Sequence, residues 1–408
     1  MEDEMTAPET RYVPHELVTQ ILLRLPVEPL LRLTCVCKAW HSTITGDRSF
    51  QREHARLQDP CVLIAPRIKI NDAGRPHASP VKVTTPCLYR WEKGQGAATL
   101  VQAMDAFFPA QQAGRRHDLA HCDGLVLVVS ADDTVRVLNP ATRRATPLLR
   151  SYVTPAALHR CFHGALGLGH DPRSNTYKVA RIYHRSVHMP ATGGCLYTLG
   201  MDVFTIGRDK HWRPTTAPPP CPVMACRTAT FFKGSLLWAI DESILLVGGD
   251  VAVRGFLRFS LEDETFSIIP APLGCPDLRN STSNLVEMHG ELCLAHEGPK
   301  EERSVRSTWV WVCDDVDGSN PPRWVRRHVM NVPCHIHLIT MSNDRILFQG
   351  ESYNLMCYDS QTIEGVRHVA TMYSLIYHHP DSNTHVKYPK QSVYSYDLIP
   401  YVPSLVPI

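Results

Sequence analysis

The sequence predicts a small all-α module of three short helices followed by a large all-β domain built as a propeller. Apolar residues recur with helical spacing up to about residue 57. Beyond residue 60 the chain instead reads as strands of four to eight residues separated by Gly, Pro, Asn and Asp. The strand region also repeats, as the blades of a propeller do. A chain of 408 residues exceeds what one hydrophobic core usually holds, so two folding units are expected.

The first helix has the clearest pattern. The helical module is expected over residues 12–57, behind an acidic segment, residues 1–11, that is expected to be disordered. Leu17, Ile21 and Leu25 recur at i, i+4 and i+8, so they lie on one face of a helix. This spacing predicts an amphipathic helix with a broad apolar face.

Two more short helices complete the predicted module. Pro26 ends the first helix, because a proline removes a backbone donor and clashes with the preceding turn. A second helix is expected over residues 29–33, and Val36, Trp40 and Ile44 mark an apolar stripe on a third. A unit of about 45 residues rarely buries enough surface to stand alone, so the module is expected to have a partner.

The strand region repeats with a period near 55 residues. Strands follow the dipeptides Asp123-Gly124, Lys233-Gly234 and His289-Gly290, and a fourth similar start has Asp344 in place of glycine. Successive starts are 110, 56 and 54 residues apart, which is one period with a single start skipped. The 348 residues from 61 to 408 then hold about six blades, with seven as the alternative.

The blades are expected to alternate hairpins with polar corners. Residues 165–169 and 177–183 have the apolar and β-branched character of strands. Between them, residues 171–175 read Asp-Pro-Arg-Ser-Asn, a composition that favours a sharp turn. This stretch therefore predicts a turn that joins two strands.

Composition excludes several classes of partner. With 42 Lys+Arg against 40 Asp+Glu, the formal charge is +2, and because the basic residues are scattered no nucleic acid is expected. The N-terminus is acidic, without the basic start and apolar run of a signal peptide, and no stretch reaches the roughly 18 apolar residues of a membrane helix. A soluble chain without a membrane partner, in the cytoplasm or the nucleus, is expected. The 14 cysteines sit mostly singly in apolar runs, as buried reduced thiols do.

The sequence does not predict an enzyme. It contains no phosphate-binding P-loop, no Gly-x-Ser-x-Gly nucleophile elbow and no His-Glu-x-x-His zinc motif. The best metal candidate is the run 334–337, Cys-His-Ile-His, with Cys221 and Cys226, but in a strand its side chains point alternately to opposite faces. Coincidence among 21 histidines explains this run better, so no metal, cofactor or catalytic residue is expected.

The motifs resemble those of a known family. Residues 13–27, Val-Pro-His-Glu-Leu-Val-Thr-Gln-Ile-Leu-Leu-Arg-Leu-Pro-Val, followed by Leu-Leu-Arg-Leu at 30–33 and Val-Cys-Lys-Ala-Trp at 36–40, resemble a plant F-box over about Tyr12 to Arg56. The rest resembles the kelch-like, F-box-associated propeller domains of plants, in residues 122–125, 137–142, 169–179 and 401–406. One departure is Val13, where the family more often has leucine, a mild change of apolar volume.

The resemblance implies a role in ubiquitin transfer. In that family the F-box helices bind a Skp-type adaptor, which holds them on a cullin scaffold with a ubiquitin-conjugating enzyme, and the propeller binds a target protein. The implied function is thus a substrate receptor of an SCF-type ubiquitin ligase, a non-catalytic subunit in ubiquitin-dependent protein degradation. Carried over by motif, the adaptor-binding residues are Pro14, Leu17, Ile21, Leu22, Leu25, Pro26, Leu30, Leu33, Val36 and Trp40.

Alternatives stay open at this point. Several of these ten residues could instead hold the helices together, because so small a unit shares its apolar surface between core and interface. The chain could also be an F-box scaffold without a degradation role, or a propeller enzyme or lectin with an incidental helical segment.

The connection between the two parts is expected to be semi-rigid. Residues 57–61 are few, contain Pro60, and run directly into the apolar residues 62–64. A Gly/Ser linker would allow many orientations, whereas this connection predicts a limited range.

Overall fold

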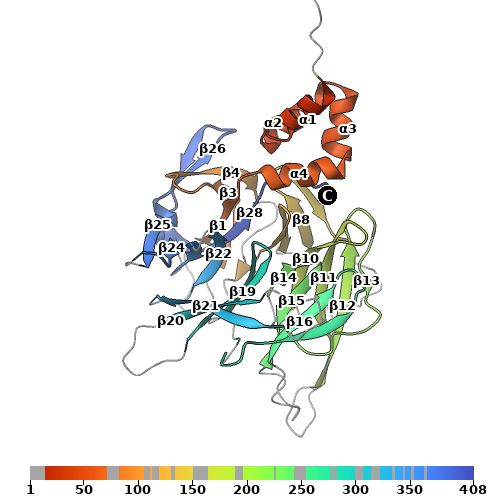
Figure 1. Cartoon of the computed structure of the whole chain (residues 1–408), viewed down its shortest axis with the longest axis vertical. Helices are drawn as coiled ribbons and strands as arrows, with labels where there is room; N and C mark the ends of the chain where they lie inside the picture. The colour runs from red at the N-terminus through yellow and green to blue at the C-terminus, as the bar shows by residue number, and fades with distance from the viewer. Residues whose placement is uncertain are drawn as a thin grey trace, which may run out of the picture.

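The computed structural model places a cluster of helices at one end of a β-propeller, with the C-terminus beside the last of those helices (Figure 1). Residues 14–408 are described, apart from the segments 71–81, 105–110, 113–118, 130–133, 150–163, 189–195, 225–226, 243–253, 276–277, 279–282, 299–306, 314–321, 333–335, 343–344, 351–352 and 363–364. The expected tail, residues 1–11, lies outside the described residues.

The helical module contains one helix more than the sequence predicts. Its elements are α1 (His15–Leu22), α2 (Val27–Arg32), the 3-10 turn η1 (Leu33–Cys35), α3 (Lys38–Gly46) and α4 (Arg48–Leu57). The three-helix expectation accounts for α1, α2 and α3 and misses α4. Asp47 separates α3 from α4, because its backbone is extended and its Oδ1 accepts hydrogen bonds from the backbone N–H groups of Ser49 and Phe50 at 2.8 and 3.1 Å.

Five four-stranded antiparallel sheets form regular blades. Their strands, in chain order, are β6 (Ala120–Cys122), β7 (Leu125–Val129), β8 (Val135–Asn139) and β9 (Arg144–Pro147); β10 (Ala165–Asp171), β11 (Thr176–His188), β12 (Leu196–Thr205) and β13 (Arg213–Pro214); β14 (Thr230–Phe232), β15 (Ser235–Ala239), β16 (Gly255–Ser260) and β17 (Phe266–Pro270); β18 (Ser283–Met288), β19 (Glu291–Glu297), β20 (Ser307–Cys313) and β21 (Trp324–Asn331); β22 (His337–Ser342), β23 (Arg345–Gln349), β24 (Asn354–Asp359) and β25 (Val366–Thr371). Within each blade, consecutive strands are neighbours.

A sixth, larger sheet closes the domain. Its eight strands are β1 (Cys61–Ile70), β2 (Lys82–Thr84), β3 (Cys87–Trp91), β4 (Ala97–Ala103), β5 (Gln111–Gln112), β26 (Ile376–His379), β27 (Thr384–Val386) and β28 (Val393–Tyr401), with the 3-10 turns η3 (Met372–Ser374) and η4 (Lys390–Ser392) nearby in the chain. β28 pairs antiparallel with β1, and Cys61 lies opposite Tyr401. The first and last strands of the domain are therefore hydrogen-bonded neighbours.

The expectation of six blades is met only in part. The described strands give five regular blades and this closing sheet, and not six or seven equal repeats. The reason is that the closing sheet takes strands from both ends of the domain, including a parallel pair between β26 and β4. A period of about 55 residues cannot describe a sheet whose strands are about 300 residues apart in the chain.

Turn geometry explains the repeated dipeptides. At 123–124, 233–234 and 289–290 both residues have positive φ, between 43° and 80°, and each pair joins the first two strands of its blade. Two successive positive φ angles are the mark of a type I′ hairpin turn, which favours glycine at its second position. The skipped repeat is the blade that begins with β10, where residues 172–175 form the turn and Asp171 Oδ1 accepts hydrogen bonds from the N–H groups of Arg173 and Ser174. The polar corner expected there is present.

The described cysteines match the expected thiol pattern. All ten of them are free of disulfides; eight are buried and only Cys35 and Cys37 are exposed. Within the described residues, no helix is long and apolar enough to span a membrane.

Candidate functional site

The helical module exposes large apolar side chains. Leu17 and Ile21 of α1 are 55% and 58% exposed, and Val36 after η1 is 56% exposed. Leu17 and Ile21 lie one turn apart, so they form a continuous apolar strip. Large aliphatic side chains exposed to this degree are typical of a surface that another protein covers.

The other predicted contact residues divide into two groups. Pro14 and Pro26 are exposed, whereas Leu25, Leu33 and Trp40 are half-buried. Leu22 and Leu30 are only 2% and 0% exposed, so they pack inside the module. The structure therefore places eight of the ten residues at or near the surface and two in the core.

Helix α4 supplies a buried polar centre that the sequence did not indicate. His54 is fully buried, its Nε2 lies 2.8 Å from the carbonyl oxygen of Leu25, and its ring stacks near Phe50. Burial lowers the pKa of His54 below its ordinary value of 6.5, although the backbone contact acts in the opposite direction. His54 thus ties α4 to the end of the α1 segment as a neutral side chain.

The C-terminal segment after β28, residues 402–408, joins the module to the propeller. Leu405 is 5% exposed and belongs to the module's apolar core, which also contains Leu22, Leu30, Ile44 and Phe50. Its neighbour Ser404 donates a hydrogen bond from Oγ to the carbonyl of Asp123 at 2.7 Å. This segment, here named the C-terminal strap, therefore contacts the helices on one side and a blade on the other.

The propeller side holds the strap through further hydrogen bonds. Asn139 Nδ2 donates to the carbonyl oxygens of Ser404 and Val406 at 3.1 and 2.8 Å. Gly124 has φ +78°, and a Cβ there would lie 2.6 Å from both Ser404 Oγ and the Val402 carbonyl oxygen. Glycine at this turn therefore serves the strap as well as the hairpin, because no side chain fits between them.

Polar contacts add to this junction. Arg48 of α4 donates from Nη1 to the carbonyl of Asn175 at 2.6 Å, in the turn between β10 and β11. Arg143 lies 3.0 Å from Asp381 and 3.9 Å from Glu28 of α2. Only three residues, 58–60, separate α4 from β1. The module is thus held against the propeller at several separate points.

A cleft of about 1140 Å³ lies between α4 and the propeller. The helix contributes Arg48, Gln51, Arg52, Ala55 and Arg56 to its wall. The propeller contributes the turns at 123–124, 174–177, 206–208 and 287–289, together with residues 400–402 and 406–408. We call this space the α4 cleft; it has a basic helical wall and a propeller wall of mixed polarity.

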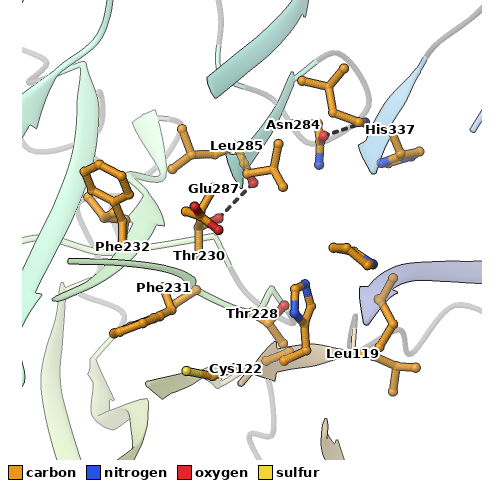
Figure 2. A pocket seen from close by; sticks show the side chains of 18 of the residues that line it. Leu119, Cys122, Thr228, Thr230, Phe231, Phe232, Asn284, Leu285, Glu287 and His337 are labelled. Atoms are coloured by element: carbon orange, nitrogen blue, oxygen red, sulfur yellow. Dashed lines mark hydrogen bonds between the residues drawn. The ribbon is translucent and has the colours of Figure 1, made fainter. Parts of the chain in front are cut away.

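The α4 cleft continues into the centre of the propeller. A second cavity, of about 480 Å³, is lined by first strands of the blades, and Figure 2 shows Cys122, Thr230, Asn284 and His337 around it, from four different blades. We call it the central channel. Two hydrogen bonds fix its wall: Thr230 Oγ1 donates to the Leu285 carbonyl at 2.8 Å, and the Leu338 N–H donates to Asn284 Oδ1 at 2.8 Å.

The two cavities share four lining residues, His121, Asp123, Glu287 and Pro400. Burial lowers the pKa of His121 to about 4, against the opposing influence of Asp123. His121 is therefore a neutral side chain at the point where cleft and channel meet.

The metal candidate from the sequence lies mostly outside the described residues. His337 lines the central channel and Cys221 is buried, whereas Cys226, Cys334 and His335 lie outside the described residues. Among the residues that the structure describes, no group of three or more His, Cys, Asp and Glu side chains is arranged to hold a metal ion.

Comparisons with known proteins agree with this architecture. Residues 13–52 match the family model of the F-box domain, and residues 99–408 match that of the F-box associated β-propeller domain. Three similar proteins of Arabidopsis thaliana are an F-box protein (24% identity over 284 residues, 63% of this chain and 56% of the relative), an F-box/LRR-repeat/kelch-repeat protein (28% over 271 residues, 63% and 64%) and an F-box/kelch-repeat protein (23% over 344 residues, 82% and 73%). The chain spans less than two thirds of the length of the first two.

Proposed function

Because the chain belongs to the plant F-box proteins with an F-box associated β-propeller domain, we propose that it is a substrate receptor of a cullin-based, SCF-type ubiquitin ligase. The module of residues 12–57 binds a Skp-type adaptor and through it a cullin, and the propeller of residues 61–408 binds the target protein. The chain works in the cytoplasm or nucleus as a non-catalytic subunit. It promotes ubiquitin transfer by holding the target at high effective concentration beside the conjugating enzyme.

The exposed apolar strip is the observation that supports adaptor binding. Leu17, Ile21 and Val36 are each more than half exposed. Burying an aliphatic side chain of this size stabilises a complex by about 1.5 to 3 kcal/mol. We place the adaptor contact on these three residues, with Pro14, Leu25, Pro26, Leu33 and Trp40 around them, and assign Leu22 and Leu30 a role inside the module.

A binding experiment tests this assignment. The double substitution Leu17→Ala and Ile21→Ala in the full chain should abolish co-purification with a Skp-type adaptor, because both side chains belong to the proposed contact. The matched control is Leu57→Ala, which truncates a leucine that is 48% exposed at the end of α4, outside the strip. Circular dichroism should be unchanged in both variants, since none of the three side chains is buried. Full adaptor binding by the double variant would remove the strip from the interface.

A further inference from the structure

The face of α4 that lines the α4 cleft carries three arginines. Arg48, Arg52 and Arg56 recur at i, i+4 and i+8, and all three line the cleft and are exposed. Residues four apart share one side of a helix, so the guanidinium groups form a row along the cleft wall. The opposite side of α4 buries Phe50 and His54 in the module. The arginine row is therefore not needed for the module's own packing.

The cleft carries an excess of positive side chains. Arg208 of the turn after β12 adds a fourth guanidinium, against the two side-chain carboxylates of Asp123 and Glu287. Both carboxylates already accept hydrogen bonds, Asp123 from the Tyr177 hydroxyl at 2.9 Å and Glu287 from the Gly290 N–H at 2.7 Å. A concave space with an excess of charge of one sign concentrates the field and attracts ligands of the other sign.

The arginines have few partners of their own. Arg48 binds a backbone carbonyl, and Arg56 lies 3.7 Å from Glu53 in an exposed pair. Within the described part of the chain, Arg48, Arg52 and Arg208 have no carboxylate within ion-pairing distance. Guanidinium groups in this state present several donors each, which suit carboxylates of an incoming chain.

The strap supplies an apolar surface to the same cleft as the arginine row. Val402, Val406 and Ile408 line the cleft and are half-buried, so each keeps part of its surface accessible. A ligand in the cleft would thus meet both guanidinium groups and aliphatic surface. This combination fits a chain with acidic and apolar side chains pointing in opposite directions.

The spacing of the row matches an extended peptide. Helical residues four apart are separated by about 6 Å along the axis, so the row spans about 12 Å. In an extended strand, alternate residues lie about 6.6 Å apart on the same side. Acidic residues at positions i, i+2 and i+4 of a strand would face Arg48, Arg52 and Arg56 in turn, while the residues between them would face the strap.

We propose that the α4 cleft binds an extended acidic segment of the target protein, with carboxylates at alternate positions and apolar residues between them. This inference rests on the proposed function, because it names the part of the target that the receptor recognises. It also places recognition beside the module, on the side of the propeller from which the central channel opens into the cleft.

Fluorescence anisotropy with two labelled peptides tests the proposal on the full chain. One peptide carries Glu-Leu-Glu-Leu-Glu between Gly/Ser flanks; the other has the same composition ordered Glu-Glu-Glu-Leu-Leu. The alternating peptide should bind at least about tenfold more tightly, since only its order presents all three carboxylates to the row. Its binding should weaken about fivefold between 0.05 and 0.3 M NaCl, because exposed charge pairs are screened.

Charge reversals locate the site. Arg52→Glu should weaken the alternating peptide by about tenfold or more, and so should Arg208→Glu, which lies in the propeller and leaves the module's helices untouched. The control is Arg323→Glu, which makes the same charge change at an exposed position outside the cleft. Equal binding of the two peptides, or equal loss in Arg323→Glu, would overturn the proposal.

Two further outcomes separate the inference from the proposed function. A third peptide carries phosphoserines in place of the glutamates. If this peptide binds and the glutamate peptide does not, the cleft recognises phosphate and not carboxylate, and the proposal as stated is overturned. Adaptor co-purification by a chain that binds neither peptide would overturn the cleft inference and leave the proposed function standing. A chain that binds the alternating peptide but fails to bind the adaptor would overturn the proposed function and leave the cleft's preference for acidic peptides standing.

Discussion

The two sides of the helical module differ in chemistry. The α1 side presents Leu17, Ile21 and Val36 to water, whereas the α4 side presents Arg48 and Arg52 to a cleft. Apolar burial supplies affinity, while charge complementarity contributes more to association rate and selectivity. Under the two proposals above, the α1 side would make the durable contact with a constant scaffold, and the α4 side the exchangeable contact with a target.

The largest effect is expected from removing the strand that closes the propeller. Truncation after Ser392 deletes β28, which pairs with β1 along nearly its whole length, and also deletes the strap. It exposes the edge of β1 and removes Leu405 from the module's core, so both the propeller and the helical module lose part of their packing. We expect aggregated protein after expression, measured as loss of the monomer peak in size-exclusion chromatography. A monomeric, strand-rich product would show that closure is dispensable.

The next largest effect is expected from a core leucine of α1, in contrast to a surface leucine of the same helix. Leu22→Ala should lower the free energy of unfolding of the module by about 2 to 5 kcal/mol, because it leaves a cavity in the core. Leu17→Ala should change it by less than about 0.5 kcal/mol, since that side chain is 55% exposed. Urea titrations followed by helical circular dichroism measure both. Equal destabilisation would mean that Leu17 also supports the module.

A smaller effect is expected from the titration of His54. Its pKa is below the ordinary value in the folded chain, so the unfolded chain binds the proton more tightly. Stability is therefore full above the ordinary value of 6.5 and is lost as pH falls through that value toward the folded-state pKa, by at most about 1.4 kcal/mol per pH unit.

The variant His54→Gln isolates this contribution. Glutamine can still donate a hydrogen bond toward the Leu25 carbonyl but does not titrate. The stability difference between the natural chain and His54→Gln, from urea titrations between pH 5 and pH 8, should depend on pH only below about 6.5. A difference that is constant over the range would exclude His54 as the titrating group.

Features that depend on local contacts could be predicted from the sequence, whereas features that depend on distant contacts could not. Helix α1 and the hairpin turns at 123–124, 233–234 and 289–290 follow from spacing and from glycine at positive φ, which are local properties. Helix α4 is harder to predict because it is strongly polar, with few large apolar residues on its buried face beyond Phe50, and because Asp47 is its one capping signal. Asp47 followed by a new helical stretch is the local signal that indicates this helix.

Distant pairings were beyond reach of the sequence. Nothing near residue 61 indicates that β1 pairs with β28, and nothing near Leu405 indicates that it enters the core of the helices. The α4 cleft combines both difficulties, since it requires the missed helix and four separate propeller turns. The spacing of Arg48, Arg52 and Arg56 is visible in the sequence, but it becomes meaningful only when the cleft is known.

The smallest predicted effect concerns the joint between the two sides. The sequence predicts that the short connection 57–61 orients the module, but the structure adds the strap as a second connection, with Leu405 in the module's core. Inserting about 20 Gly/Ser residues after Asp59 should therefore leave adaptor binding, target binding and the pattern of ubiquitinated lysines nearly unchanged. The strap still holds the module in its orientation on the propeller, so the insertion does not lower the effective concentration of the target at the conjugating enzyme.

Combining the insertion with Leu405→Ala should change that result. With both connections weakened, the module samples many orientations, and the effective concentration of target lysines at the conjugating enzyme falls with tether length. We expect slower chain formation and ubiquitin spread over more lysines in a reconstituted assay, at matched adaptor and target binding. Leu405→Ala alone is the control, since residues 58–60 still constrain the module. A doubly altered chain with the natural rate and lysine pattern would show that orientation has no part in transfer, and that the propeller only needs to be tethered to the module.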